Sequence, residues 1–143
     1  MKLQTWLIDI PQKECAALLT GAPFGRLGVV VNGRPEIFPV NHVIDSESGH
    51  VTFATDNRTK LHAAKDWPWV AYEVDGVEQG VDGEEGWSVL VVGHVEEIAE
   101  PDRVIRLESQ RRALWHPGKD VRWMEIIPEK VTGKRISTVV QDR

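Results

Sequence analysis

Short apolar runs rich in Val, Ile and Phe recur along this chain between Gly, Pro, Asn and Asp residues, a pattern typical of β-strands. The runs GRLGVVV (25–31) and RPEIFPVNHVI (34–44) flank Asn32-Gly33. Two β-rich runs joined by Asn-Gly are the strongest short-range signal of a hairpin. Further strands are predicted at 50–55, 69–74, 87–98 and 121–128. The pattern therefore predicts six strands, with Gly93 marking a bulge or bend in the fifth.

Three short helices are predicted between these strands, at 12–19, from residue 56 or 57 to Pro68, and at 102–114. Pro11 and Pro101 stand at the first turns of two of them, where a missing N–H costs nothing. The first helix should pack as a lid. Residues 75–86 read as an acidic, Gly-rich loop, and a polar segment follows residue 128. Hairpins rather than crossover helices connect the strands, which favours a closed antiparallel barrel over a parallel sheet.

Composition adds limits to this mainly β interpretation. At 143 residues the chain is the length of one domain, 1–143. Its formal charge of −5, with Lys and Arg scattered, argues against a nucleic-acid partner. Cys15 is the only cysteine, which excludes an intrachain disulfide and fits a reducing cytoplasm. No signal peptide, membrane span or metal-ligand spacing is found, so we expect a soluble cytoplasmic protein without a membrane partner or a metal.

The stretch ATDNRTKLHAAK (54–65) places two cations in the predicted first turn of a helix. A helix start already carries partial positive charge from its unpaired N–H groups, so Arg58 and Lys60 are unfavourable there unless an anion lies between them. A phosphate held by Arg58, Thr59, Lys60 and backbone N–H groups would make each contact favourable. A solvated helix start with Lys60 merely exposed explains the stretch equally well.

Pro39 interrupts the strand pattern of IFPVNHV (37–43). Proline cannot donate to a β-ladder, so its neighbours are predicted to lie at a sheet edge or irregularity, where backbone groups can meet a ligand. The amide of Asn41 both donates and accepts, as the heteroatom edge of a flavin ring requires. An edge-strand proline that discourages aggregation accounts for the same pattern.

Trp87 begins a strand directly after the acidic loop, and for that position it is singled out among the six tryptophans as a ligand contact. Core packing is the commoner role of any one tryptophan. Cys15 lies on a predicted amphipathic helix, where a buried structural thiol is commoner than a nucleophile. No GxSxG motif surrounds a serine, so hydrolase chemistry has no support.

Five segments together, GRLGVVVNGRPEIFPVNHVID, VTFATDNRTKL, VAYEVDGV, GWSVLVVGHVEEI and IIPEKVTGKRI, resemble the pyridoxamine 5'-phosphate oxidase-like, FMN-binding split-barrel family. The resemblance covers roughly residues 10–136 in the same order. It implies a six-stranded antiparallel split β-barrel with a few short helices. It also implies a homodimer with two flavin sites at the subunit interface.

The resemblance assigns site residues as well. Pro39, Val40 and Asn41 would lie along the flavin ring, and the segment with Thr55, Arg58, Thr59 and Lys60 would hold the phosphate, with Lys60 as the family's phosphate-binding lysine. Trp87 and Ser88 would approach the ring, often from the partner subunit. Arg58 stands where relatives often carry glycine, so it either binds phosphate or points away. The C-terminal Arg- and His-bearing signature of true pyridoxamine phosphate oxidases is missing, which argues against vitamin B6 oxidation.

The sequence thus predicts an FMN-binding oxidoreductase with a small-molecule substrate, in which the protein positions the flavin and the flavin performs the redox step. Two alternatives stay open. One is a deazaflavin in place of FMN, although the acidic residues at 75–86 disfavour its polyglutamate tail. The other is a module that binds flavin or haem without turnover.

Overall fold

The computed structural model describes residues 2–56, 63, 65–81, 83–111 and 121–141. These residues form eight strands and two helices: β1 (Lys2–Asp9), α1 (Gln12–Gly21), β2 (Gly25–Val31), β3 (Arg34–Val40), β4 (His42–Ile44), β5 (Val51–Thr55), β6 (Trp69–Gly80), β7 (Gly83–Glu97), α3 (Pro101–Gln110) and β8 (Arg122–Gln141). Every strand pairing among them is antiparallel. The mainly β, antiparallel class predicted from the sequence is therefore confirmed, with two short helices in the described part of the chain.

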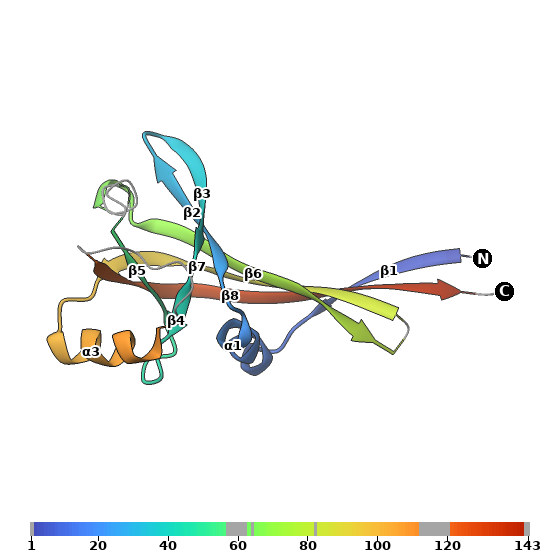
Figure 1. The fold of residues 1–143 in the computed structure, drawn as a ribbon. Helices are drawn as coiled ribbons and strands as arrows, with labels where there is room; N and C mark the ends of the chain where they lie inside the picture. Colours follow the sequence, from blue (N-terminus) through green and yellow to red (C-terminus); the bar gives the residue numbers. More distant parts are fainter. Residues whose placement is uncertain (1, 57–62, 64, 82, 112–120, 142–143) are drawn as a thin grey trace.

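The strands form one curled sheet in the order β3-β2-β6-β7-β8-β5-β4, with β1 added to β8 (Figure 1). β3 and β4 are the two ends of this order, yet only Asn41 separates them along the chain. The two edges of the sheet must therefore come together at Asn41. We call residues 40–42, where β3 passes into β4, the seam.

The interior of the curled sheet holds the main apolar core, which includes Leu27, Phe53, Tyr72, Val89 and Ile126. α1 packs against β8, β4 and β7, and its buried residues Cys15 and Leu19 join this core. A second, smaller cluster lies under α3 and joins Leu107 to Trp123 of β8. Pro101 opens α3 as predicted, whereas Pro11 is the N-cap residue directly before α1. Cys15 is buried, as expected of a structural thiol.

Two local features of the sheet, the turn between β2 and β3 and a bulge in β7, depend on glycine. Asn32 and Gly33 have φ values of 50° and 75°, which are the positive values that a tight hairpin turn between β2 and β3 requires. At Gly93 the register of β7 with β8 shifts, and a Cβ there would collide with the carbonyl oxygen of Ile127. The predicted hairpin and bulge are both confirmed.

The structure has eight strands where the sequence predicted six. β1 was not predicted as a strand, and β4 continues a run that was assigned to a single strand with β3. The predicted acidic loop at 75–86 is instead the end of β6 and the start of β7, which pair as far as Gly80 and Gly83. The strand predicted at 121–128 does not end there, because the polar segment after it continues the 20-residue β8.

These additional paired segments form an extension of the sheet that we call the arm: residues 2–9, 75–81, 83–88 and 134–141. The arm runs past α1 and ends near both termini (Figure 1). Its residues Leu7, Ile136 and Val77 lie in one row across the strands, with Gly86 between the last two. They are 65%, 48% and 67% exposed, so this row is an apolar stripe on the surface of the arm.

Candidate functional site

The seam brings the sequence-predicted ring contacts to the meeting point of the two sheet edges. Pro39 lies on β3, which pairs with β2 alone in the described part of the chain, so the prediction of an edge strand is confirmed. Val40 is buried and pairs with Gly25 of β2, while Asn41 is half-buried between the strands. The backbone of residues 39–41 therefore lies at the edge of the barrel.

A buried hydrogen-bond network supports the seam from inside the barrel. The Tyr72 hydroxyl donates to the carbonyl oxygen of Val40 at 3.2 Å and is hydrogen bonded to Nδ1 of His42. Nε2 of His42 lies 2.8 Å from the carbonyl oxygen of Leu19 at the end of α1. Burial raises the pKa of Tyr72, so the hydroxyl keeps its proton. Two further elements, α1 and β6, are thus hydrogen bonded to the seam.

Gly25 makes room for this network. An ideal Cβ at position 25 would lie 2.5 Å from Cζ of Tyr72 and 2.7 Å from the carbonyl oxygen of Glu73. The Tyr72 ring therefore reaches Val40 by passing through the space that a larger residue would fill. Neither Tyr72 nor His42 was predicted as a site residue. The alternation of WVAYEV was an available signal, because it places Tyr72 on the same inward face as Val70 and Val74.

Thr55 closes β5 and is 3% exposed. β4 pairs with β5 through His42 and Phe53, and continuing that register places Thr55 beside the seam. Across β5, Thr55 pairs with Arg122 of β8, whose guanidinium donates to Glu97 at 3.2 Å. Arg58, Thr59 and Lys60 lie outside the described residues, so their predicted phosphate contacts stay predictions.

Trp87 and Ser88 lie farther along the sheet. Trp87 pairs with Gly76, and its indole occupies the space above that glycine, 2.8 Å from an ideal Cβ. The ring packs against the main core, the commoner role of tryptophan, and Ser88 points to the opposite face. Trp87 and Val40 border the same core, but the β3–β2, β2–β6 and β6–β7 pairings separate their strands. No pairing among the described strands joins Trp87 or Ser88 directly to the seam.

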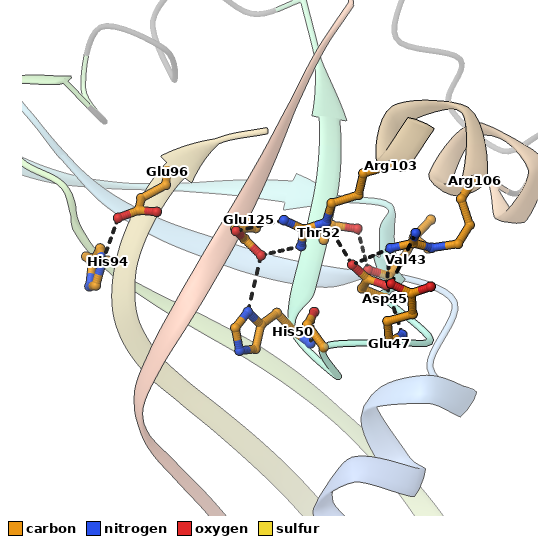
Figure 2. Close-up of polar contacts among 11 residues, drawn as sticks. Val43, Asp45, Glu47, His50, Thr52, His94, Glu96, Arg103, Arg106 and Glu125 are labelled. Atoms are coloured by element: carbon orange, nitrogen blue, oxygen red, sulfur yellow. Dashed lines mark hydrogen bonds and ion pairs between the residues drawn. The ribbon is translucent and has the colours of Figure 1, made fainter. Parts of the chain in front are cut away.

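A second polar group, which we call the α3 ion cluster, holds α3 to the sheet (Figure 2). It consists of Asp45, His50, Arg103, Arg106 and Glu125. Arg103 donates to Asp45 at 2.9 Å and bridges both carboxylate oxygens of Glu125, and Arg106 donates to Asp45 at 2.9 Å. His50 adds a 3.2 Å contact to Glu125.

The carboxylates of the α3 ion cluster are held in the charged form. Burial of Asp45 opposes its ionisation, but the N–H of Glu47 and the guanidiniums of Arg106 and Arg103 outweigh it and lower its pKa to about 2. The hydrogen bonds from Arg103 likewise lower the pKa of Glu125. Sequence analysis missed this cluster, although the spacing of Arg103 and Arg106 puts both on one face of the predicted helix.

An open groove of about 440 Å³ lies beside α1, between Leu19, Ile44 and Gln110. Of the described residues that line it, Asp45 alone is charged, and two arginines already hold its carboxylate. The groove thus offers a phosphate no cation among these residues. Leu19 connects the groove to the seam, because its carbonyl accepts from His42.

Comparison with known proteins identifies the family whose sequences this chain matches. The family model of pyridoxamine 5'-phosphate oxidase matches residues 11–135. A Mycobacterium tuberculosis protein described as uncharacterized is 30% identical over 138 residues, covering 91% of this chain and 86% of that one. The FAD-binding protein of Mycobacterium smegmatis is 28% identical, with a TM-score of 0.70 and coverage of 90% and 98%.

A FAD-binding protein from Mesorhizobium loti has a TM-score of 0.77 over 94% of this chain and 99% of its own. At 22% identity, this second likeness extends to the fold alone. Both structures share the curled antiparallel sheet described above. None of the described helices is long and apolar enough to cross a membrane.

Proposed function

The chain belongs to the pyridoxamine 5'-phosphate oxidase family, and on that premise we propose that it binds FMN and acts as a flavin-dependent oxidoreductase on a small molecule. The observation that carries the proposal is the meeting of the two sheet edges at Asn41. This arrangement sets the predicted ring contacts beside Thr55, which begins the predicted phosphate segment.

The described residues fit the heteroatom edge of a flavin. Pro39 and Val40 supply backbone at a sheet edge, and the Asn41 amide offers both a donor and an acceptor. Thr55 would add a hydroxyl beside them if the register of β4 with β5 continues past His42 and Phe53. Arg58, Thr59 and Lys60 would supply charge-assisted hydrogen bonds to the phosphate.

In this proposal the residues of the chain bind, orient and exclude water. When bound, the flavin supplies the redox chemistry itself. The seam would fix the ring edge through backbone groups, which keep their geometry because Tyr72 and His42 support them. The buried wall formed by Val40 and Thr55 would keep water from one side of the ring.

FAD is the second candidate cofactor, because the Mycobacterium smegmatis protein that is 28% identical is described as FAD binding. The same seam would serve the ring of either flavin, since the two share the isoalloxazine and its first phosphate. The choice depends on whether the surface beyond residues 55–60 has room for an adenosine.

We further propose that two copies of the chain form a homodimer, with flavin at their interface. The apolar stripe of the arm, made of Leu7, Ile136 and Val77, supports this proposal because monomers seldom expose such a row. A partner subunit would also bring a second Trp87 and Ser88, whose strand β7 is not paired with β3 or β4 in the described sheet of their own chain.

The test is the absorbance spectrum of the purified protein, with mass spectrometry of what denaturation releases. A yellow protein that releases FMN supports the proposal, and release of FAD selects the second candidate. A colourless protein is titrated with FMN, FAD and a deazaflavin. Binding of the deazaflavin alone, or of none, contradicts the proposal. Reduction by a nicotinamide donor and reoxidation by acceptors then separates an oxidoreductase from a binder without turnover.

A further inference from the structure

Tyr72 is the side chain through which the barrel interior reaches the seam. It is fully buried, and its hydroxyl contacts both the Val40 carbonyl oxygen and Nδ1 of His42. His42 is in turn 7% exposed and contacts α1 through Leu19. A phenylalanine at this position would pack into the core equally well. The buried hydroxyl of Tyr72 therefore indicates a function beyond packing.

The carbonyl that Tyr72 holds fixes the direction of the next N–H. The described chain contains no cis peptide bond, so the Val40–Asn41 bond is trans. In a planar trans peptide the carbonyl oxygen and the following N–H point in opposite directions. Because the Val40 oxygen points to the Tyr72 hydroxyl, the Asn41 N–H points away from Tyr72.

The protons of the network show how His42 takes part. Carbonyl oxygens only accept, so Nε2 of His42 carries the hydrogen shared with Leu19, and the Tyr72 hydroxyl is the donor to Val40. The Tyr72 hydroxyl has one proton. With Nδ1 protonated, His42 donates to Tyr72 and Tyr72 donates to Val40. With Nδ1 bare, it competes with the Val40 carbonyl for that proton.

We propose that Tyr72 and His42 are positioning residues for the flavin. By holding the Val40 carbonyl inward, they aim the Asn41 N–H at the ring edge that residues 39–41 are proposed to contact. Neither side chain touches the flavin in this arrangement. The inference rests on the proposed function, because it needs a flavin at the seam.

The test compares two variants that each remove one buried hydroxyl. Tyr72→Phe removes the donor to Val40, and Thr52→Val removes a matched donor, because Thr52 is fully buried and donates to the Val43 carbonyl at 2.7 Å (Figure 2). We expect Tyr72→Phe to weaken FMN binding about threefold to tenfold and to shift the flavin absorption maximum. Thr52→Val should leave both unchanged, although thermal unfolding will show that it too lost stability.

A double-variant cycle with His42→Asn tests the shared route. Since both residues act through one carbonyl, the double variant should lose no more affinity than the weaker-binding single variant. Full additivity would overturn the coupling. Wild-type affinity and spectrum in a folded Tyr72→Phe protein would overturn the inference while leaving the proposed function standing. A wild-type protein that binds neither FMN nor FAD would instead overturn the proposed function, and with it this inference.

If the Tyr72→Phe protein does not fold, a second measurement on the wild-type sequence tests the inference. Tyr72 is the only tyrosine of the chain, so growth with 3-fluorotyrosine labels this one position. Its ¹⁹F resonance should shift as FMN is added, with the same midpoint as the flavin spectrum. Flavin binding without such a shift would overturn the inference.

Discussion

Thr55, Asn41 and Ser88, the described hydroxyl and amide side chains proposed to contact the flavin, are all neutral. Arg122 lies opposite Thr55, but it already donates to Glu97. We therefore expect a doubly negative phosphate to depend on two cations that follow Thr55 in the sequence, Arg58 and Lys60. This need for charge is what the sequence alone predicted from the crowding of the two cations at a helix start.

The Lys60→Ala variant tests that dependence at the residue scale. It should lower flavin affinity by roughly 1.5–3 kcal/mol, because a charge-assisted hydrogen bond to the phosphate is lost. Isothermal titration with FMN measures the change, and riboflavin, which has no phosphate, should lose almost nothing. Lys65→Ala, an exposed lysine a few residues on, is the matched control. Equal losses for FMN and riboflavin would remove Lys60 from the phosphate site.

A site residue could be predicted from the sequence when its own chemistry, or that of its immediate neighbours, indicated its structural role. Pro39 identified the edge strand because proline cannot donate to a ladder, whatever its tertiary surroundings. Tyr72 could not be found this way, since its hydroxyl acts on Val40, 32 residues earlier in the chain. Trp87 was selected for its position beside a predicted loop, and that reason was wrong because the segment is a paired hairpin. Its contact with a ligand stays a prediction.

Among the elements, α3 depends on charge as much as on apolar packing. Leu107 is its buried apolar residue, while Arg103 and Arg106 bind Asp45 at the end of β4. Because each arginine shares a carboxylate with another group, loss of Asp45 ionisation releases two contacts at once. The α3 ion cluster therefore makes the attachment of this helix sensitive to acid.

Acid should weaken the fold through Asp45. Its pKa is lowered from 3.8 to about 2, so ionised Asp45 stabilises the folded state above pH 4, and this contribution is lost as the pH falls from about 4 towards 2. The loss should be of order 2 kcal/mol, at about 1.4 kcal/mol per pKa unit. Urea unfolding between pH 5 and pH 2 measures it.

Two variants test whether Asp45 causes this loss of stability at low pH. Asp45→Asn should be less stable at neutral pH and should lose less stability on acidification. Glu96→Gln, which alters an exposed partner of His94, should keep the wild-type pH profile. An unchanged profile in Asp45→Asn would assign the acid sensitivity to other carboxylates.

The elements that the sequence predicted well carry local signals. The hairpin at Asn32-Gly33, the bulge at Gly93 and the helix after Pro101 each depend on residues within one turn. β1 and the second half of β8 carry no such signal, because the arm exposes both faces and shows no clean apolar alternation. The residues of β1 pair with residues of β8 that lie more than 120 positions later, as Asp9 does with Lys134, so no local signal identifies β1 as a strand.

At the scale of the whole molecule, the apolar stripe of the arm is the surface through which we expect two copies of the chain to form the proposed homodimer. Ile136→Lys places a charge in the centre of the apolar stripe and should convert the proposed homodimer to monomer at micromolar concentration. Light scattering after size exclusion measures the mass. Glu84→Lys, at an exposed position of the same arm, is the control for added charge. A wild-type protein that is monomeric would contradict the proposal.

The dimer variant also reports on the site. If the interface completes the flavin site, the monomeric Ile136→Lys protein should bind FMN at least about tenfold more weakly than the dimer, because contacts from the partner are lost. Unchanged affinity in a monomer would place the whole site within one chain.

The pairing of Lys2 with Gln141 has a consequence for how the protein is made. β1 leaves the ribosome before its hydrogen-bonding partner in β8, which lies more than 120 residues further along the chain. Until then the exposed Trp6, Leu7 and Ile8 lack the neighbouring strand that orders them. Contacts of such long sequence separation slow folding, so the nascent chain passes through a stage that invites aggregation and chaperone binding.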